Sequence, residues 1–181
     1  MPTKRVCVPL AAGFEEIEVV APVDILRRAG ASVTLAAIGD DLHVAGRSGI
    51  TLKADISFLT LFSANYDMLV IPGGPAVQTL RQNQRMGVIV RDFESTKKPI
   101  GAICAAPLIL HDSGLLLRKR YTAHSSTKAE LPDALYREKV VRDGKIITSR
   151  GAGTAIDFGL ELVRVLYDEA TANEIAQAIM V

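Results

Sequence analysis

The sequence has few cysteines and little net charge. Only two cysteines, Cys7 and Cys104, occur among the 181 residues, and neither stands in the C-x-x-C spacing that often holds zinc. This usage excludes a disulfide framework and predicts a reducing, cytoplasmic location. The formal net charge of +1 provides no field that would attract phosphates or anionic lipid, so nucleic acid is not an expected partner.

Long apolar runs and low-complexity segments are also lacking. Uncharged stretches such as residues 99–110 are well short of the ~20 residues that a membrane-spanning helix needs, so no membrane insertion is expected. The apolar run at residues 6–12 has the length of a strand and leads into glutamates, which argues against an export signal. With 49% hydrophobic and 23% charged residues, the composition predicts one folded domain over residues 1–181.

Strand-length apolar runs alternate with helical segments along the chain. The expected strands are residues 5–10, 32–38, 66–71 and 99–104, and the first expected helix is residues 15–29. The run Met68-Leu69-Val70-Ile71 has no polar member, as strands covered on both faces require. The alternation predicts an α/β fold: a flavodoxin-like, doubly wound, mostly parallel sheet with helices on both faces.

Two segments interrupt this alternation. Residues 43–55 and 139–149 contain glycines between β-prone stretches, and we interpret both as hairpins or paired edge strands that decorate the main sheet. Helical periodicity returns over residues 154–167 and 170–179. The short basic run Arg118-Lys119-Arg120 is interpreted as a solvated loop.

Cys104 is the strongest candidate for a reactive residue. A buried strand, residues 100–103, runs into it, and Pro107 suits the first turn of a helix that continues to His111. A sulfur at such a strand-to-helix turn faces the positive end of the helix dipole, which favours the nucleophilic thiolate. The turn is similar to the serine nucleophile elbow of hydrolases. The alternative is an inert core cysteine.

The segment Pro72-Gly73-Gly74 ends the expected strand at residues 66–71. If that strand neighbours the one before Cys104, backbone N–H groups of Gly74 and Ala105 would form an oxyanion hole, with Gly73 beside them. A plain turn is the alternative, because Pro-Gly-Gly by itself is weak evidence.

Three glutamates, Glu15, Glu16 and Glu18, open the first helix, where carboxylates suit the helix dipole and need no further role. The apolar side of this helix is marked by Ile17, Val20, Ala21 and Ile25. Glu18 lies next to that side, so it is the one of the three that we expect to be buried. Beside the sulfur, a buried Glu18 would have a raised pKa and could donate a hydrogen bond as the neutral acid.

Two further residues are weaker candidates. His124 follows the β-prone residues 121–123 and is the histidine expected at the same sheet edge, although an ordinary surface or core histidine is the alternative. The loop at residues 149–154 lacks both the lysine of a P-loop and the third glycine of a dinucleotide fingerprint, so nucleotide binding is rejected. Arg150 in that loop either meets an anionic group of a substrate or pairs structurally.

Taken together, these residues resemble the DJ-1/ThiJ/PfpI superfamily over nearly the whole chain, and its bacterial ThiJ-type branch most closely. The segments that carry the resemblance include residues 13–18, 22–24, 28–30, 72–74, 102–107 and 148–158. The resemblance implies a class I glutamine amidotransferase-like fold with Cys104 as nucleophile and Glu18 as the protonated acid bonded to it. It further implies oxyanion donors from Gly74 and Ala105 and a loosely placed His124.

The resemblance also implies partners and an activity. It implies no metal or organic cofactor and a homodimer that pairs through the first helix, with Asp24, Arg27 and Arg28 near the interface. The implied activity is cysteine-dependent chemistry on methylglyoxal or its early adducts, as a glutathione-independent glyoxalase or a deglycase in carbonyl and oxidative stress defence.

Two other activities stay open. The first alternative is a non-catalytic redox sensor or chaperone in which Cys104 is oxidised to sulfinate. A cysteine peptidase ranks lower, because the residue after Cys104, where a histidine would be needed, is Ala105. Two departures from the family pattern, no cysteine at residues 46–53 and Ser125 after His124, argue against regulation by an auxiliary thiol.

Overall fold

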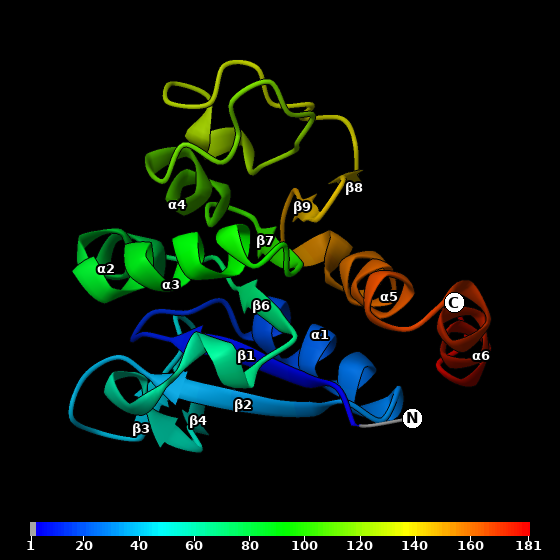
Figure 1. Cartoon of the computed structure of the whole chain (residues 1–181), viewed down its shortest axis with the longest axis horizontal. Coiled ribbons are helices and arrows are strands. Elements are labelled where there is room, and N and C mark those ends of the chain that lie inside the picture. Colours follow the sequence, from blue (N-terminus) through cyan, green and yellow to red (C-terminus); the bar gives the residue numbers. More distant parts are fainter. Residues whose placement is uncertain (1–2) are drawn as a thin grey trace.

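The structure is a computed structural model that describes residues 3–181. Its centre is a seven-stranded sheet in the order β5-β2-β1-β6-β7-β9-β8 (Figure 1). The strands are β1 Arg5–Leu10, β2 Ser32–Ala37, β5 Ile56–Ser57, β6 Met68–Ile71, β7 Ile100–Ile103, β8 Val140–Asp143 and β9 Ile146–Ser149. Neighbouring strands run parallel except for β8 and β9. The predicted doubly wound, mostly parallel sheet is confirmed.

Helices cover both faces of this sheet. They are α1 Glu16–Arg28, α2 Ala76–Gln82, α3 Gln84–Ser95, α4 Pro107–Asp112, α5 Ala155–Leu166 and α6 Glu169–Ala178. The chain moves one way along the sheet from β1 to β2 and the opposite way from β6 to β7. Right-handed crossovers therefore place α1 and α3 on opposite faces. Helix α5 packs on α1 and on the β7–β9 side of the sheet, and α6 packs on α5.

The central strands are apolar on both faces, as a doubly covered sheet requires. Every residue of β6 and β7 is buried. Gly101 in β7 lets α5 approach the sheet closely, because a Cβ there would lie 2.7 Å from Leu162 Cδ2. This close packing fixes the strand whose next residue is Cys104.

The two interrupting segments differ from each other in the structure. Strands β3 (His43–Ala45) and β4 (Thr51–Lys53) form a separate two-stranded antiparallel sheet, which confirms the first hairpin. The second segment is also antiparallel, but β9 is an internal strand that pairs in parallel with β7. The interpretation of the second segment as decoration is therefore wrong for β9, whose residues are all buried, and holds only for the edge strand β8.

A crevice is expected between β1 and β6, because the chain leaves these neighbours in opposite directions. The turns after β1, β6, β7 and β9 all lie at this edge, and short 3-10 helices, Ser125–Thr127 and Ala152–Thr154, flank it. Among the described residues, no helix combines the length and the apolar character that crossing a membrane would require.

Candidate active site

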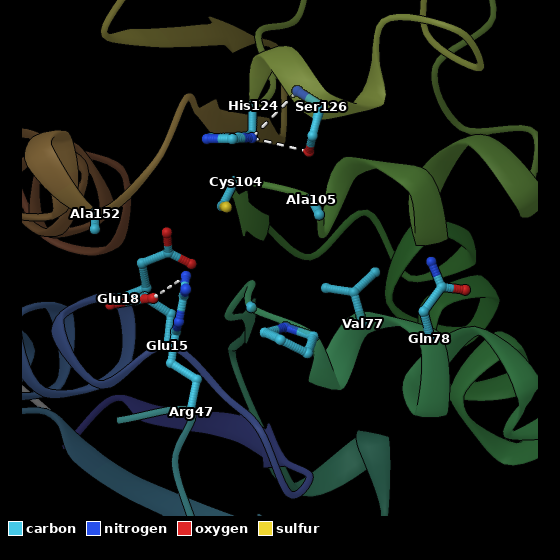
Figure 2. Close-up of a pocket in the computed structure, with 12 residues that line it drawn as sticks. Glu15, Glu18, Arg47, Val77, Gln78, Cys104, Ala105, His124, Ser126 and Ala152 are labelled. Atoms are coloured by element: carbon cyan, nitrogen blue, oxygen red, sulfur yellow. Dashed lines mark hydrogen bonds and ion pairs between the residues drawn. The ribbon is translucent and has the colours of Figure 1, made fainter. Parts of the chain in front are cut away.

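A cavity of about 340 Å³ opens at the carboxyl ends of β1, β6 and β7 (Figure 2). The side chains around it come from six separate parts of the chain. The titratable residues that line it are Glu15, Glu18, Arg47, Cys104 and His124. It therefore brings Cys104, Glu18 and His124, three residues singled out from the sequence, into one place.

Cys104 occupies a sharp turn between β7 and α4. Its φ of +65° lies in the left-handed region that few non-glycine residues adopt, at a cost of about 1–3 kcal/mol in comparable cases. Two backbone hydrogen bonds hold this conformation: the Cys104 N–H donates to Ser149 O at 2.8 Å, and Cys104 O accepts from the His124 N–H at 2.8 Å. The predicted elbow is thus present, with the half-buried sulfur facing the cavity.

Glu18 is buried beside this sulfur. Its residue exposure is 1%, its Oε2 accepts a 2.9 Å hydrogen bond from the Gly73 N–H, and its carboxyl is in hydrogen-bonding contact with Cys104. Of the four residues that the sequence marked as the apolar side of α1, Ile25 is buried and Ala21 partly buried, whereas Ile17 and Val20 are 54% and 48% exposed. Instead, α1 turns its first acidic residues inward against the loops that follow the strands.

The pKa values of both the acid and the thiol lie above their ordinary values. Burial raises the pKa of Glu18 to about 7, although bonds from Cys104 and the Gly73 N–H oppose the shift. Burial and the negative charge of Glu18 raise the pKa of Cys104 to about 12, against a lowering by the N–H groups of Gly74 and Ala105. The shift is opposite in direction to the lowering expected from a helix start: α4 begins only at Pro107, and burial is the largest influence on the sulfur.

The glycine pair after β6 serves two different atoms. The Gly74 N–H, with that of Ala105, bonds the sulfur of Cys104, so both predicted oxyanion donors lie beside the thiol. The Gly73 N–H instead donates to Glu18, so it is not free to face an oxyanion as the sequence had suggested. Gly73 is needed for its lack of a side chain, because a Cβ there would lie 2.5 Å from both Cys104 Cβ and Glu18 Oε2.

His124 lines the cavity but is turned toward Ser126. Its Nδ1 lies 2.9 Å from Ser126 Oγ and accepts from the Ser126 N–H at 3.2 Å (Figure 2). A neutral ring with Nδ1 as acceptor carries its proton on Nε2. In the part of the chain that the structure describes, no hydrogen bond joins this ring to Cys104, so a Cys–His dyad is not assembled.

Arg150 lies outside the Cys104 cavity. It borders a neighbouring hollow of about 400 Å³, which reaches past His124 to Tyr136. Its Nη1 donates to Arg137 O at 3.0 Å, across the base of the segment that leads to β8. Of the two roles that the sequence left open for Arg150, this position favours structural pairing over contact with a substrate.

Arg47 is a cavity residue that sequence reasoning missed. It sits in the turn between β3 and β4, and its Nη1 pairs with Glu15 Oε2 at 3.1 Å (Figure 2). Gly46 and Gly49 on either side of Arg47 indicated that the backbone here could lie close to another segment, but they did not indicate which segment. Nothing local in the sequence shows that this turn docks on the start of α1.

No group of three or more His, Cys, Asp or Glu side chains suited to a metal ion is found within residues 3–181.

Comparisons with known proteins agree on one family. A sequence model of the DJ-1/PfpI family matches residues 4–165. Two Arabidopsis thaliana relatives, Protein DJ-1 homologs A and B, are 37% and 35% identical in alignments 182 positions long that cover 99% of this chain. The chain spans less than half of their length, 46% and 42%.

Two further relatives match over most of their length. Glutathione-independent glyoxalase DJR-1.2 of Caenorhabditis elegans is 30% identical over 164 residues, 89% of this chain and 87% of the worm protein. The crystal structure of Drosophila melanogaster DJ-1beta superposes with a TM-score of 0.94 at 34% identity, covering 99% of this chain and 98% of the fly chain.

Proposed function

The chain belongs to the DJ-1/PfpI family, and from that membership we propose that it converts methylglyoxal or related dicarbonyls by cysteine-dependent, glutathione-independent chemistry. One observation carries the proposal: Glu18, 1% exposed, contacts the sulfur of Cys104 in a cavity that opens to solvent. The worm relative named as a glutathione-independent glyoxalase supports the same reaction class. Early methylglyoxal adducts of amines and thiols are a second substrate class for the same attack.

The proposed reaction needs no external oxidant. The sulfur of Cys104 adds to the aldehyde carbon while Glu18 takes the thiol proton, and the N–H groups of Gly74 and Ala105 stabilise the oxyanion of the hemithioacetal. Glu18 returns its proton to the oxyanion, accepts the hydrogen of that carbon as a proton, and delivers it to the ketone carbon through an enediol. The first carbon is thereby oxidised to a thioester as the second is reduced to an alcohol. Water hydrolyses the thioester and releases lactate and the thiol.

Glu18 acts in this scheme as a general base, so no permanently ionised thiolate is required. A pKa of about 7 keeps a substantial fraction of the carboxyl ionised and able to accept the Cys104 proton at neutral pH. A base of this strength lies near the optimum for proton transfer at that pH. The expectation of a helix-activated thiolate is thus replaced by proton transfer within a buried pair.

Lactate formation from methylglyoxal tests the proposal directly. We expect turnover by the wild-type chain, none by Cys104→Ala and a large loss in Glu18→Gln. Cys7→Ala is the matched control, because Cys7 is fully buried in β1 and should not affect turnover. Absence of turnover in the wild type, or full turnover in Cys104→Ala, would refute the proposed reaction.

Oxidation sensing is the second candidate function, and the same geometry favours it. A sulfinate on Cys104 would accept hydrogen bonds from the N–H groups of Gly74 and Ala105 and from protonated Glu18. Mild peroxide should then add two oxygens at Cys104, which peptide mass spectrometry can detect. Glu18→Gln should form less of this product. A Cys104 that stays unmodified under conditions that oxidise exposed methionine would remove this candidate.

We further infer that two copies pair through α1. Ile17 and Val20 expose apolar side chains on this helix, and Ile156 of α5, the helix that packs on α1, is also 41% exposed. Asp24 and Arg28 form an exposed 2.6 Å ion pair further along the helix. An apolar patch with a charged rim is typical of a subunit interface.

A further inference from the structure

The turn between β3 and β4 is docked on the first turn of α1. The Gly13 N–H donates to Ala45 O at 2.8 Å, and the Arg47 N–H donates to Phe14 O at 2.9 Å. Through this contact the turn brings Arg47 from a separate two-stranded sheet to the mouth of the Cys104 cavity. The position of Arg47 therefore depends on whatever holds the turn in place.

The carboxylate of Glu16 sits at the centre of that contact. Glu16 is 6% exposed, its Oε1 accepts from the Ser48 N–H at 2.7 Å, and a Cβ on Gly46 would overlap this oxygen. Although burial raises its pKa, hydrogen bonds from its own N–H and from Ser48 and Ile50 outweigh that effect, so the pKa of Glu16 lies below its ordinary value. Glu16 thus holds the turn as a carboxylate that accepts a hydrogen bond from its backbone.

Two observations bear on how Glu16 acts on the turn. Glu16 Oε2 is buried and has no hydrogen-bond partner among residues 3–181, which is a cost that native structures rarely retain without a role. The ion pair of Arg47 with Glu15 is a weak restraint on the turn, since the Arg47 side chain is 55% exposed although that of Glu15 is 14% exposed. The two backbone hydrogen bonds hold residues 45 and 47, and the buried carboxylate of Glu16 adds a charged acceptor for the tip of the turn at Ser48.

We propose that Glu16 is a positioning residue: by holding the turn at residues 46–50 it keeps Arg47 paired with Glu15, and so sets the charge at the mouth of the Cys104 cavity. Without the carboxylate of Glu16, the turn would move away and leave Glu15 unpaired beside the opening. An unpaired Glu15 would repel anionic molecules from Cys104 and leave access for neutral ones unchanged.

Alkylation of Cys104 by a charged and a neutral reagent of similar size tests this role. The rates with iodoacetate and iodoacetamide are measured by peptide mass spectrometry at low ionic strength. The quantity compared is the iodoacetate rate divided by the iodoacetamide rate, because this ratio cancels changes in the reactivity of the sulfur itself. In Arg47→Ala the ratio should fall by about fivefold, as expected for the loss of one nearby charge in water. Glu16→Ala should lower it by a similar factor.

A second route to the same displacement keeps the test decisive if Glu16→Ala folds poorly. Gly46→Ala pushes the turn off Glu16 from the opposite side and should lower the ratio equally. In an Arg47→Ala background, neither substitution should change the ratio further, because the cation they act through is gone. Glu94→Gln and Arg91→Ala, at exposed positions on α3, serve as charge-matched controls and should leave the ratio unchanged.

The inference is overturned by any of three results. The first is a wild-type ratio in Arg47→Ala, and the second is a wild-type ratio in both Glu16→Ala and Gly46→Ala. The third is that adding Glu16→Ala or Gly46→Ala to Arg47→Ala lowers the ratio as much as it does in the wild-type background. Because alkylation does not require turnover of a dicarbonyl, its outcome is independent of whether the proposed reaction occurs.

Discussion

The backbone N–H of Gly73 donates a 2.9 Å hydrogen bond to the carboxyl of Glu18, 55 residues away in the sequence. This bond joins the loop after β6 to the first turn of α1 and fixes the carboxyl beside Cys104. It also stabilises the ionised form, so it restrains the rise in the pKa of Glu18 that burial causes, to about 7. The pKa of Glu18 is thus set to about 7 by two opposing effects, burial and hydrogen bonding.

Replacing Gly73 by alanine should damage both stability and reactivity. Its Cβ would lie 2.5 Å from Cys104 Cβ and from Glu18 Oε2, and 3.0 Å from the Ile103 carbonyl oxygen, so the loop or the elbow must shift. We expect a loss of about 1–3 kcal/mol in urea-unfolding free energy, the usual cost of overpacking, and slower alkylation of Cys104 by iodoacetamide. Gly153→Ala is the control, because nothing lies within 4 Å of a Cβ there. Equal behaviour of the two variants would contradict the account.

The alkylation rate of Cys104 should follow the titration of Glu18. As pH rises through about 7, Glu18 loses its proton and becomes able to accept the one on the thiol, so the rate should rise and then level off. In Glu18→Gln this step should vanish. The pKa of Cys104 should also fall in that variant, because the Glu18 charge that raises it is gone. A step near pH 7 that survives in Glu18→Gln would assign it to another group.

Folding stability should fall as the pH rises through the same range. The pKa of Glu18 is raised in the folded protein to about 7 from an ordinary value of 4.5, so its protonated form is preferentially stabilised. Its contribution is complete below about pH 4.5 and is lost by about pH 7, a difference of about 3 kcal/mol. Glu18→Gln should therefore show a smaller decline between pH 5 and 8 in urea titrations. The same decline in both proteins would argue against a raised pKa.

His124 should matter far less than Cys104 or Glu18. Its Nδ1 is engaged by Ser126, and the ring makes no hydrogen bond to Cys104 in the described structure. A positioned general base contributes about 10²–10⁴-fold to a rate, so His124→Ala should lose less than about tenfold in kcat for methylglyoxal. Ser126→Ala should have a similarly small effect. A loss of a hundredfold or more in His124→Ala would show that the histidine moves into the reaction.

The proposed pairing through α1 can be tested with two valines of equal exposure. Val20 on α1 and Val88 on α3 are both 48% exposed, but α1 and α3 lie on opposite faces of the sheet. Val20→Asp should convert a dimer into a monomer in light-scattering measurements, because the carboxylate would be desolvated at the interface. Val88→Asp should leave the mass unchanged. A monomeric wild type, or a dimer that survives Val20→Asp, would rule out this interface.

The sequence alone determined the central strands β1, β2, β6 and β7 and the elbow of Cys104. Apolar runs such as Met68–Ile71 indicate doubly covered strands, since burial on both faces favours apolar side chains, whereas the equally buried β9 carries Thr148 and Ser149 and was not recognised. The step from a buried strand through Cys104 to Pro107 likewise depends on local geometry, and the structure contains it. These features follow from neighbours in the chain, which is why they could be predicted.

Only the tertiary structure decided what surrounds the sulfur. The local pattern correctly indicated a buried Glu18, but it did not indicate that Glu16 would be buried by a distant turn while Ile17 and Val20 stay exposed. The position of Arg47 beside Glu15 and the raised pKa of Cys104 also result from contacts between segments that are distant in sequence. Burial and charge at a point in space are summed over segments far apart in sequence, so no local pattern can supply them.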